Sequence, residues 1–149
     1  MIAEYVGRTL PSSRPYLVGR EKVREFALAV GEGASVCTDL DAARAAGHPD
    51  LVAPPTFAAA FPLPLMEAFL RDPAVGWDYG HMVHGEQSFT AHRPLYAGDE
   101  VVTTVHVDEL RTRAGSLFLT LRFEVADATG APVLTALALF VTTAPEGAS

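Results

Sequence analysis

A carboxylate and a thiol lie five residues apart in the segment FALAVGEGASVCTD, at Glu32 and Cys37. A carboxylate can act as a general acid or base, whereas a Cys, with a free pKa of about 8.5, is a soft nucleophile and a poor base near neutral pH. A free Cys in an apolar stretch is usually a small core residue. Acid–base chemistry in this segment therefore depends on Glu32 and on a second group from elsewhere in the chain.

Histidine is the usual second group, and HMVHGEQSF holds two of them, at His81 and His84. At the start of a strand, side chains three residues apart point to opposite faces. A shared metal site is therefore not expected, and we predict neither a metal nor a cofactor. His84, followed by Gly85, is the candidate for chemistry.

The composition fits one domain over residues 1–149. No apolar run approaches the roughly 20 residues of a membrane span, and the start, MIAEYVGRTLPSS, does not resemble a signal peptide. A single Cys excludes an internal disulfide and fits a reducing cytoplasm. The net charge of −7 and the scattered Arg residues argue against a nucleic-acid partner.

The first half of the sequence predicts helices. From Arg20 the spacing of apolar residues is helical, with Gly31 as the C-terminal cap. Residues 39–46 predict a short second helix with Asp39 as its N-cap. Residues 55–70 predict a buried helix interrupted by two prolines, Pro62 and Pro64.

The second half predicts strands. Apolar and polar residues alternate over 101–108 and 117–125, which predicts two half-buried strands. Residues 133–141 are apolar on both faces, as in a strand that is covered on both sides. A further strand is expected to end at Arg93-Pro94. Turn signals lie at 114–116 and 127–130, and the tail APEGAS is expected to fray. Four strands in meander order after an early buried helix predict an α+β domain.

The segment from Phe26 to Phe57 resembles the MaoC-like (type 2, R-specific) enoyl hydratases and dehydratases. Their pattern is Gly-Asp-x-Asn-Pro-aliphatic-His-x-Asp, followed by a His-Gly motif. Gly31 and Asp39 match it, Glu32 stands where the family has Asp, Cys37 where it has His, and Pro54 where it has Gly. HGEQSF and HRPLYAGDEV extend the resemblance to residues 5–143. The resemblance implies the hot-dog fold, a curved antiparallel sheet wrapped around a central helix.

In the family, the His removes the α-proton, the Asp orients a water, and the Gly donates its backbone N–H to the oxyanion. Cys37 is a poor substitute for the base, and Pro54 has no N–H to donate. Glu32 adds a methylene that moves its oxygens by roughly 1.5 Å, a displacement that can cost about 100-fold in rate. The resemblance therefore implies a chain that has lost catalysis. It also implies substrate-binding residues, which are Pro54, Thr56, Phe57, Phe61, His84 and Gly85.

The leading hypothesis is a non-catalytic, channel-forming subunit of a heterodimeric (3R)-hydroxyacyl-thioester dehydratase. Its partner would be a hot-dog chain that carries the intact Asp and His. Its substrate would be an acyl-ACP or acyl-CoA thioester of fatty-acid or polyketide biosynthesis. The two chains would join through an open edge of the sheet. One alternative is a self-sufficient homodimeric hydratase or dehydratase that uses Glu32 and His84. Others are an acyl-binding module without enzymatic activity and, more remotely, a thioesterase acting through Glu67.

Overall fold

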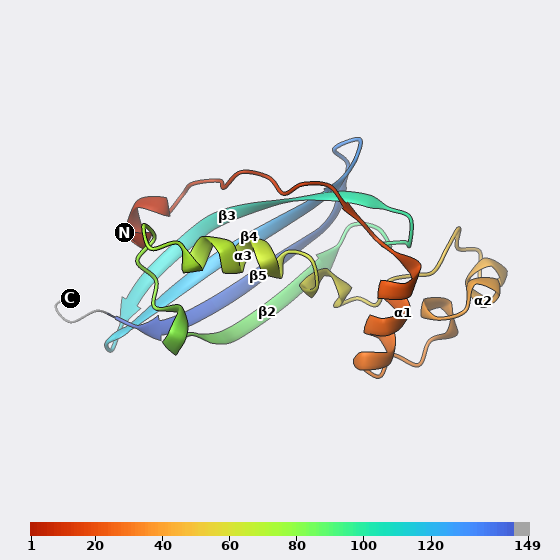
Figure 1. The fold of residues 1–149 in the computed structure, drawn as a ribbon, viewed down its shortest axis with the longest axis horizontal. Coiled ribbons are helices and arrows are strands. Elements are labelled where there is room, and N and C mark those ends of the chain that lie inside the picture. Colours follow the sequence, from red (N-terminus) through yellow and green to blue (C-terminus); the bar gives the residue numbers. More distant parts are fainter. Residues whose placement is uncertain (145–149) are drawn as a thin grey trace.

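The computed structural model describes residues 1–144, so the tail predicted to fray lies, from Pro145 onward, outside the described residues. A five-stranded sheet curves around one helix, α3, and two smaller helices lie beyond one end of the sheet (Figure 1). The helices are α1 (Arg20–Ala29), α2 (Leu40–Ala45) and α3 (Leu63–Arg71), with short 3₁₀ turns η1 (Ile2–Tyr5), η2 (Ser35–Cys37), η3 (Phe57–Ala59) and η4 (Tyr79–His81).

The sheet is antiparallel throughout, with the strand order β1-β3-β4-β5-β2. The strands are β1 (Tyr16–Leu17), β2 (Val83–Ala91), β3 (Glu100–Arg113), β4 (Ser116–Asp127) and β5 (Pro132–Thr143). The two predicted hairpin turns join β3 to β4 and β4 to β5. The fold class predicted from the sequence, an α+β hot-dog, is confirmed.

The predicted meander order is correct for β3, β4 and β5 but wrong for β2, which pairs with β5 rather than with its sequence neighbour β3. The other edge of β3 is already occupied by the N-terminal segment. The amides of Gly7, Leu10 and Ser13 donate to the carbonyls of Val107, Val105 and Thr103, at 2.8 Å in each case. With these backbone groups paired, the place open to β2 is the far edge of the sheet, beside β5.

The predicted helix over residues 55–70 is shorter than expected. It divides into η3 and α3, and α3 begins at Leu63, directly after Pro62, with Pro64 in its first turn. A proline is tolerated there because the first-turn amides have no partner within the helix. Met66 and Leu70 of α3 are buried in the core with inward-facing sheet residues such as Leu121.

The sequence also predicts that β5 is covered on both faces, and this is wrong. Its inward side chains are buried, but Leu137, which points outward, is 41% exposed. The described residues place helix α3 on the inner face of the sheet, while the outer face of β5 remains open.

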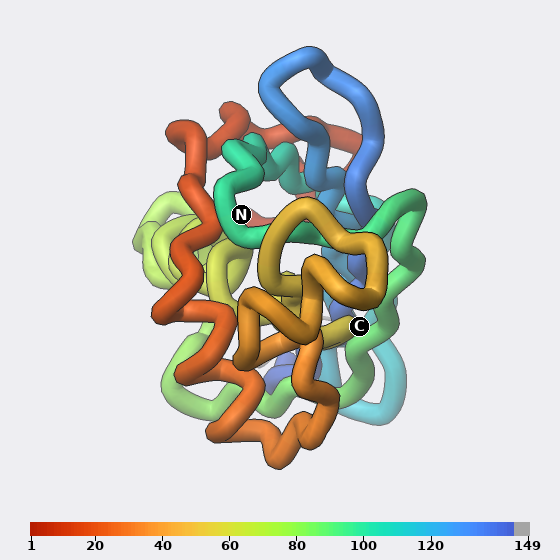
Figure 2. Tube along the Cα trace, turned by 90° about the vertical axis from the view of Figure 1, so that its right-hand side faces the viewer, coloured from red at the N-terminus to blue at the C-terminus, as the bar shows by residue number. Residues whose placement is uncertain are grey.

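Helices α1 and α2, with the loops around them, form an overhang across one end of the sheet (Figure 1). Viewed from this end, the segment 30–50 lies in front of the strands (Figure 2). Asp39 caps α2 as predicted, accepting bonds from the amides of Asp41 and Ala42 at 2.8 and 3.2 Å. Arg20 donates to Asp50 at 2.7 and 2.9 Å and ties the start of α1 to the end of the overhang.

No helix among residues 1–144 is both long enough and apolar enough to cross a bilayer.

Candidate functional site

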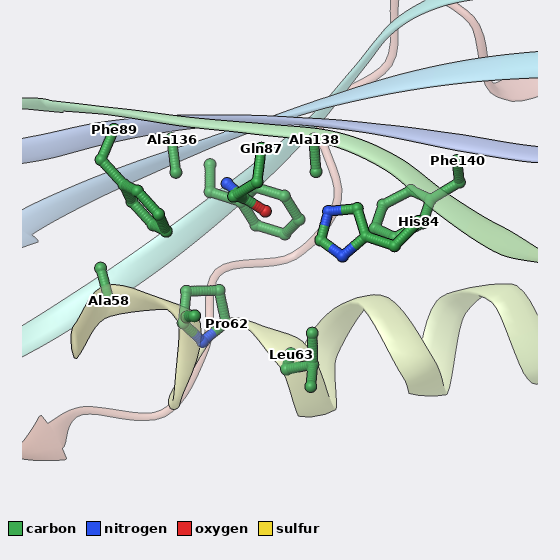
Figure 3. Close-up of a pocket in the computed structure, with 11 residues that line it drawn as sticks. Ala58, Pro62, Leu63, His84, Gln87, Phe89, Ala136, Ala138 and Phe140 are labelled. Atoms are coloured by element: carbon green, nitrogen blue, oxygen red, sulfur yellow. The ribbon is translucent and has the colours of Figure 1, made fainter. Parts of the chain in front are cut away.

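Two adjoining cavities lie between the helices and the inner face of β2 and β5. The first, called the overhang cavity, has a volume of about 320 Å³ and is lined by the overhang and by the ends of two strands, with Glu32, Cys37, Pro54, Ala58, Ala91 and Leu134 among its residues. The second, called the alanine cavity, has a volume of about 270 Å³ and is lined by Ala58, Ala59, Ala136, Ala138, His84 and Gln87, with Pro62, Leu63 and three Phe side chains (Figure 3). Both volumes are near the lower end of the range for small-molecule sites.

Glu32 reaches the overhang cavity but is engaged in a local turn. Its Oε1 accepts a bond from the amide of Ala34 at 2.9 Å, and the residue is half-buried. The carboxylate therefore helps to shape the loop after α1, and one of its two oxygens already has a donor.

Cys37 lies on the wall of the same cavity and is 4% exposed. Burial raises the pKa of its thiol, and the negative charge of Glu32 raises it further. Both effects keep the sulfur protonated at neutral pH, so this residue is not poised to act as a base or a nucleophile.

Pro54 is buried in the wall of the overhang cavity, in a stretch without a free amide. The N–H of Ala53 donates to the carbonyl of Leu95 at 2.8 Å, and Pro54 and Pro55 have no N–H. An oxyanion placed here would find no backbone donor from residues 53–55.

The cation on this cavity wall is Arg93, and it is bound to carboxylates. Its guanidinium contacts Asp99 at 2.8 and 3.2 Å and Asp127 at 3.6 Å. The hydrogen bonds to Asp99 raise the pKa of Arg93. Because Arg93 links the ends of three strands, we assign it to the framework of the cavity.

His84 lies on β2 beside the alanine cavity, with its ring centroid 4.8 Å from that of Phe140 (Figure 3). A β-bulge interrupts the pairing of β2 with β5 between His84 and Glu86. Because of the bulge, His84 and Gln87 both face inward, although strict alternation would place them on opposite faces. The amide nitrogen of Gln87 donates to the carbonyl of Leu137 at 3.0 Å, which holds this side chain in place.

The structure does not bring the sequence-predicted residues into one site. Glu32, Cys37 and Pro54 line the overhang cavity, His84 lines the alanine cavity, and the two cavities share Ala58. Phe57 and Phe61 are buried core residues, Thr56 and Gly85 are exposed, and none of these four lines either cavity. Their roles as substrate-binding residues remain predictions.

Two other residues considered in the sequence analysis, Glu67 and His81, make local side-chain contacts. Glu67 accepts a bond from Arg71 at 2.8 Å on the surface of α3, and His81 contacts Asp78 at 2.8 Å. Within residues 1–144, no group of three or more His, Cys, Asp or Glu side chains could hold a metal ion.

Sequence reasoning missed Gln87 and the alanines of the second cavity. Gly85 within a strand is a signal for a bulge, and a bulge at this point turns Gln87 inward. Small residues in the apolar run LTALALF were a second signal, because alanines among large residues leave space on one face of a strand.

Comparisons with known proteins identify the family. A family model described as "FAS1-like, dehydratase domain region" matches residues 4–136. A UPF0336 protein of Saccharopolyspora erythraea is 47% identical over 137 residues, which cover 92% of this chain and 88% of the relative.

Solved structures agree. One chain of a C-terminally truncated HadBC (3R-hydroxyacyl-ACP dehydratase) complex from Mycobacterium tuberculosis is 27% identical, with a TM-score of 0.84 and coverage of 95% of this chain and 99% of that one. A MaoC-like dehydratase is 33% identical with a TM-score of 0.84, covering 98% of this chain and 44% of that one. The chain therefore belongs to the FAS1-like dehydratase family, among the MaoC-like hot-dog dehydratases and hydratases.

Proposed function

We propose that this chain is the non-catalytic, channel-forming subunit of a cytoplasmic, heterodimeric (3R)-hydroxyacyl-thioester dehydratase that serves fatty-acid or polyketide biosynthesis. The observation that carries the proposal is the state of the overhang cavity. Its wall contains Glu32, Cys37 and Pro54, the residues that the resemblance aligns with the family's motif, and there a buried thiol and a proline stand in place of the base and the amide donor.

Dehydration of a 3-hydroxyacyl thioester needs a base for the α-proton, an acid for the departing hydroxyl, and donors for the oxygen that becomes enolate-like. Cys37 is protonated and Pro54 cannot donate a hydrogen bond. Glu32 is engaged in a local turn with the amide of Ala34, so in this proposal another chain supplies the base, the acid and the donors.

The edge of the sheet offers a place for that chain. Every residue of β2 except Phe89 is exposed, and β2 is bonded to the sheet on one side only. Unpaired strand edges invite pairing with another strand. The Mycobacterium tuberculosis structure described above is a complex of hot-dog subunits, which supports a partner of the same fold.

The alternative, a homodimer that uses Glu32 and His84, requires both side chains to act on one substrate. They line different cavities that meet at Ala58, and His84 packs against Phe140. This separation favours the heterodimer.

The test combines this chain with a hot-dog chain from the same organism that carries the intact Asp and His motif. We expect a stable complex that converts (3R)-hydroxyoctanoyl-CoA to the enoyl thioester much faster than either chain alone. Replacing the partner's catalytic His should abolish turnover, while Glu32→Gln in this chain should leave it within about twofold, since a group outside the chemistry contributes little.

Failure of the two chains to associate, or a rate no greater than that of the partner alone, would contradict the proposal. Turnover by this chain alone, lost on Glu32→Gln or on His84→Ala, would instead support the homodimeric enzyme. Binding of acyl thioesters without turnover in any combination would support the acyl-binding module.

A further inference from the structure

The backbone around the overhang cavity offers a ligand few hydrogen-bond donors. The amide of Ala53 is paired with the carbonyl of Leu95 at 2.8 Å, and the amide of Val52 with the carbonyl of Val36 at 3.0 Å. Three residues of the wall have no N–H at all, namely Pro54, Pro55 and Pro94. A carbonyl oxygen or a carboxylate of a ligand therefore finds no partner at these positions.

Glu32 gives the same cavity a hydrogen-bond acceptor and a negative charge. Its Oε1 accepts a bond from the amide of Ala34 at 2.9 Å, and its Oε2 has no hydrogen bond or ion pair with the residues of 1–144. Burial, and after it the charge of Glu32, raises the pKa of the Cys37 thiol. The charge of Glu32 therefore acts on the wall of the cavity and is not confined to the loop.

The nearby cation does not offset this charge. The guanidinium of Arg93 contacts Asp99 at 2.8 Å and Asp127 at 3.6 Å, so one cation faces two carboxylates. Most of the remaining wall is hydrocarbon, with Val36, Val52, Ala58 and Leu134 among its residues. Among the described residues, the lining thus combines an apolar surface with a carboxylate oxygen that has no cation.

This combination suits a ligand that carries a positive charge on a small hydrocarbon body. Hydrogen bonds between a cation and a carboxylate are among the strongest in proteins. At about 30 Å³ for each water-sized group, a volume of about 320 Å³ holds roughly ten non-hydrogen atoms. Because Glu32 is half-buried, the N–H groups of an ammonium that it does not bind can remain in contact with water.

We propose that the overhang cavity binds a primary amine in its ammonium form, with Glu32 pairing the ammonium and the apolar wall covering a compact hydrocarbon body. A site that stabilises an oxyanion presents donors, whereas this cavity presents an acceptor, so its polarity is the reverse. The inference goes beyond the proposed function and holds whether or not the chain joins a dehydratase.

The test measures dissociation constants by ¹H–¹⁵N NMR titration of the full-length chain at pH 7 with three ligands of similar shape. These are 2-phenylethylamine, a cation, 2-phenylethanol, which is neutral, and 3-phenylpropionate, an anion. We expect the amine to bind at least about tenfold more tightly than the alcohol, because hydrogen bonds to charged groups contribute roughly 10–150-fold in a binding constant. The propionate should bind more weakly than either, and the amide of Ala34, which donates to Glu32, should shift with the amine.

Glu32→Gln removes the charge and retains an oxygen for the amide of Ala34. We expect this variant to bind the amine at least about tenfold more weakly and the alcohol within about twofold of wild type. Glu25→Gln is the matched control, since Glu25 is an exposed carboxylate of α1 that does not line the cavity, and its loss should leave all three affinities unchanged.

Methylamine separates the cavity from the charge, because it carries the ammonium without a hydrocarbon body. It should bind at least about tenfold more weakly than 2-phenylethylamine. The comparison of ligands on wild-type protein needs no variant, so it decides the matter even if Glu32→Gln does not fold.

Equal affinities for the amine, the alcohol and the propionate would overturn the inference. The same conclusion would follow if methylamine bound as tightly as 2-phenylethylamine, if Glu32→Gln kept the preference for the amine, or if Glu25→Gln abolished it. The proposed function fails separately, because no amine takes part in the dehydration assay. Amine binding without partner-dependent dehydration would leave this inference standing, and the converse would leave only the proposed function.

Discussion

Cys37 occupies a cavity wall, yet it is 4% exposed and burial raises the pKa of its thiol. We therefore expect native protein to react with a disulfide reagent such as Ellman's reagent at least about tenfold more slowly than protein unfolded in urea, since only an accessible thiolate attacks. The measurement is the absorbance of the released thiol. It reports one site, because the chain has a single Cys.

Equal reaction rates in the native and unfolded protein would contradict this description of Cys37. Cys37→Ser supplies the background, since that variant should show no reaction in either state.

Single residues near the motif were predictable because their chemistry follows from their type. A proline at position 54 cannot donate an amide hydrogen wherever it lies, and an isolated Cys in an apolar stretch is usually buried, as Cys37 is. The inward position of Gln87 was not predictable from alternation, because the bulge before Glu86 changes which face each later residue of β2 occupies.

At the scale of elements, the hairpin between β3 and β4 contains a strained residue. Ala114 has a φ of +49°, and Gly115 follows it with a φ of +75°. A two-residue turn with both φ values positive favours Asn before Gly. We expect Ala114→Asn to raise the free energy of unfolding by about 0.5 kcal/mol, measured by urea denaturation, because a left-handed conformation is costly for Ala.

Ala128→Asn in the other hairpin is the control for this prediction. Ala128 is exposed and does not have a positive φ, so its replacement should give no gain. A destabilised Ala114→Asn variant, or the same gain at both positions, would show that backbone strain at Ala114 is not the cause.

The ion pair between Arg20 and Asp50 ties the overhang together and predicts a pH dependence. The hydrogen bonds from Arg20 lower the pKa of Asp50 to about 2. A carboxyl whose pKa is lowered by folding stabilises the protein above its ordinary pKa of about 3.9 and loses that contribution as the pH falls toward 2. We expect the stability difference between wild type and Asp50→Asn to be constant above about pH 5 and to shrink between pH 4 and 2.

Urea denaturation across this pH range measures the difference. Adding Asp50→Asn to an Arg20→Gln background should have little further effect, because the pair is already broken. A stability difference that does not change with pH would refute the assignment.

Elements with strong local signals were predictable, and those that depend on distant contacts were not. Helix α2, its Asp39 cap and both hairpins follow from caps and turns in the sequence. The place of β2 follows instead from the N-terminal segment, which occupies the outer edge of β3. The exposed outer face of β5 was also unpredictable, since apolar residues such as Leu137 suggest cover that the described fold does not provide.

At the scale of the whole molecule, the free edge of β2 should carry the partner. Ser88 and Thr90 are exposed residues of this strand and pair with outward-facing residues of β5. Lysine on an edge strand discourages further pairing. We expect Ser88→Lys with Thr90→Lys to weaken the heterodimer by roughly tenfold, equivalent to about 1.4 kcal/mol, as measured by analytical ultracentrifugation.

Thr112→Lys is the matched control, because Thr112 is exposed on β3, away from β2 in the strand order. Equal weakening by this control, or an unaffected heterodimer with lysines on β2, would place the interface elsewhere.

The most direct measurement is the rate at which the purified chain, without a companion, forms enoyl thioester from (3R)-hydroxyoctanoyl-CoA, followed by the absorbance of the conjugated product. The account predicts no conversion above the uncatalysed background, and conversion once a chain with the intact Asp and His is added. An ordinary enzymatic rate from the isolated chain would contradict it, because a protonated Cys37 and the proline at position 54 would then coexist with catalysis.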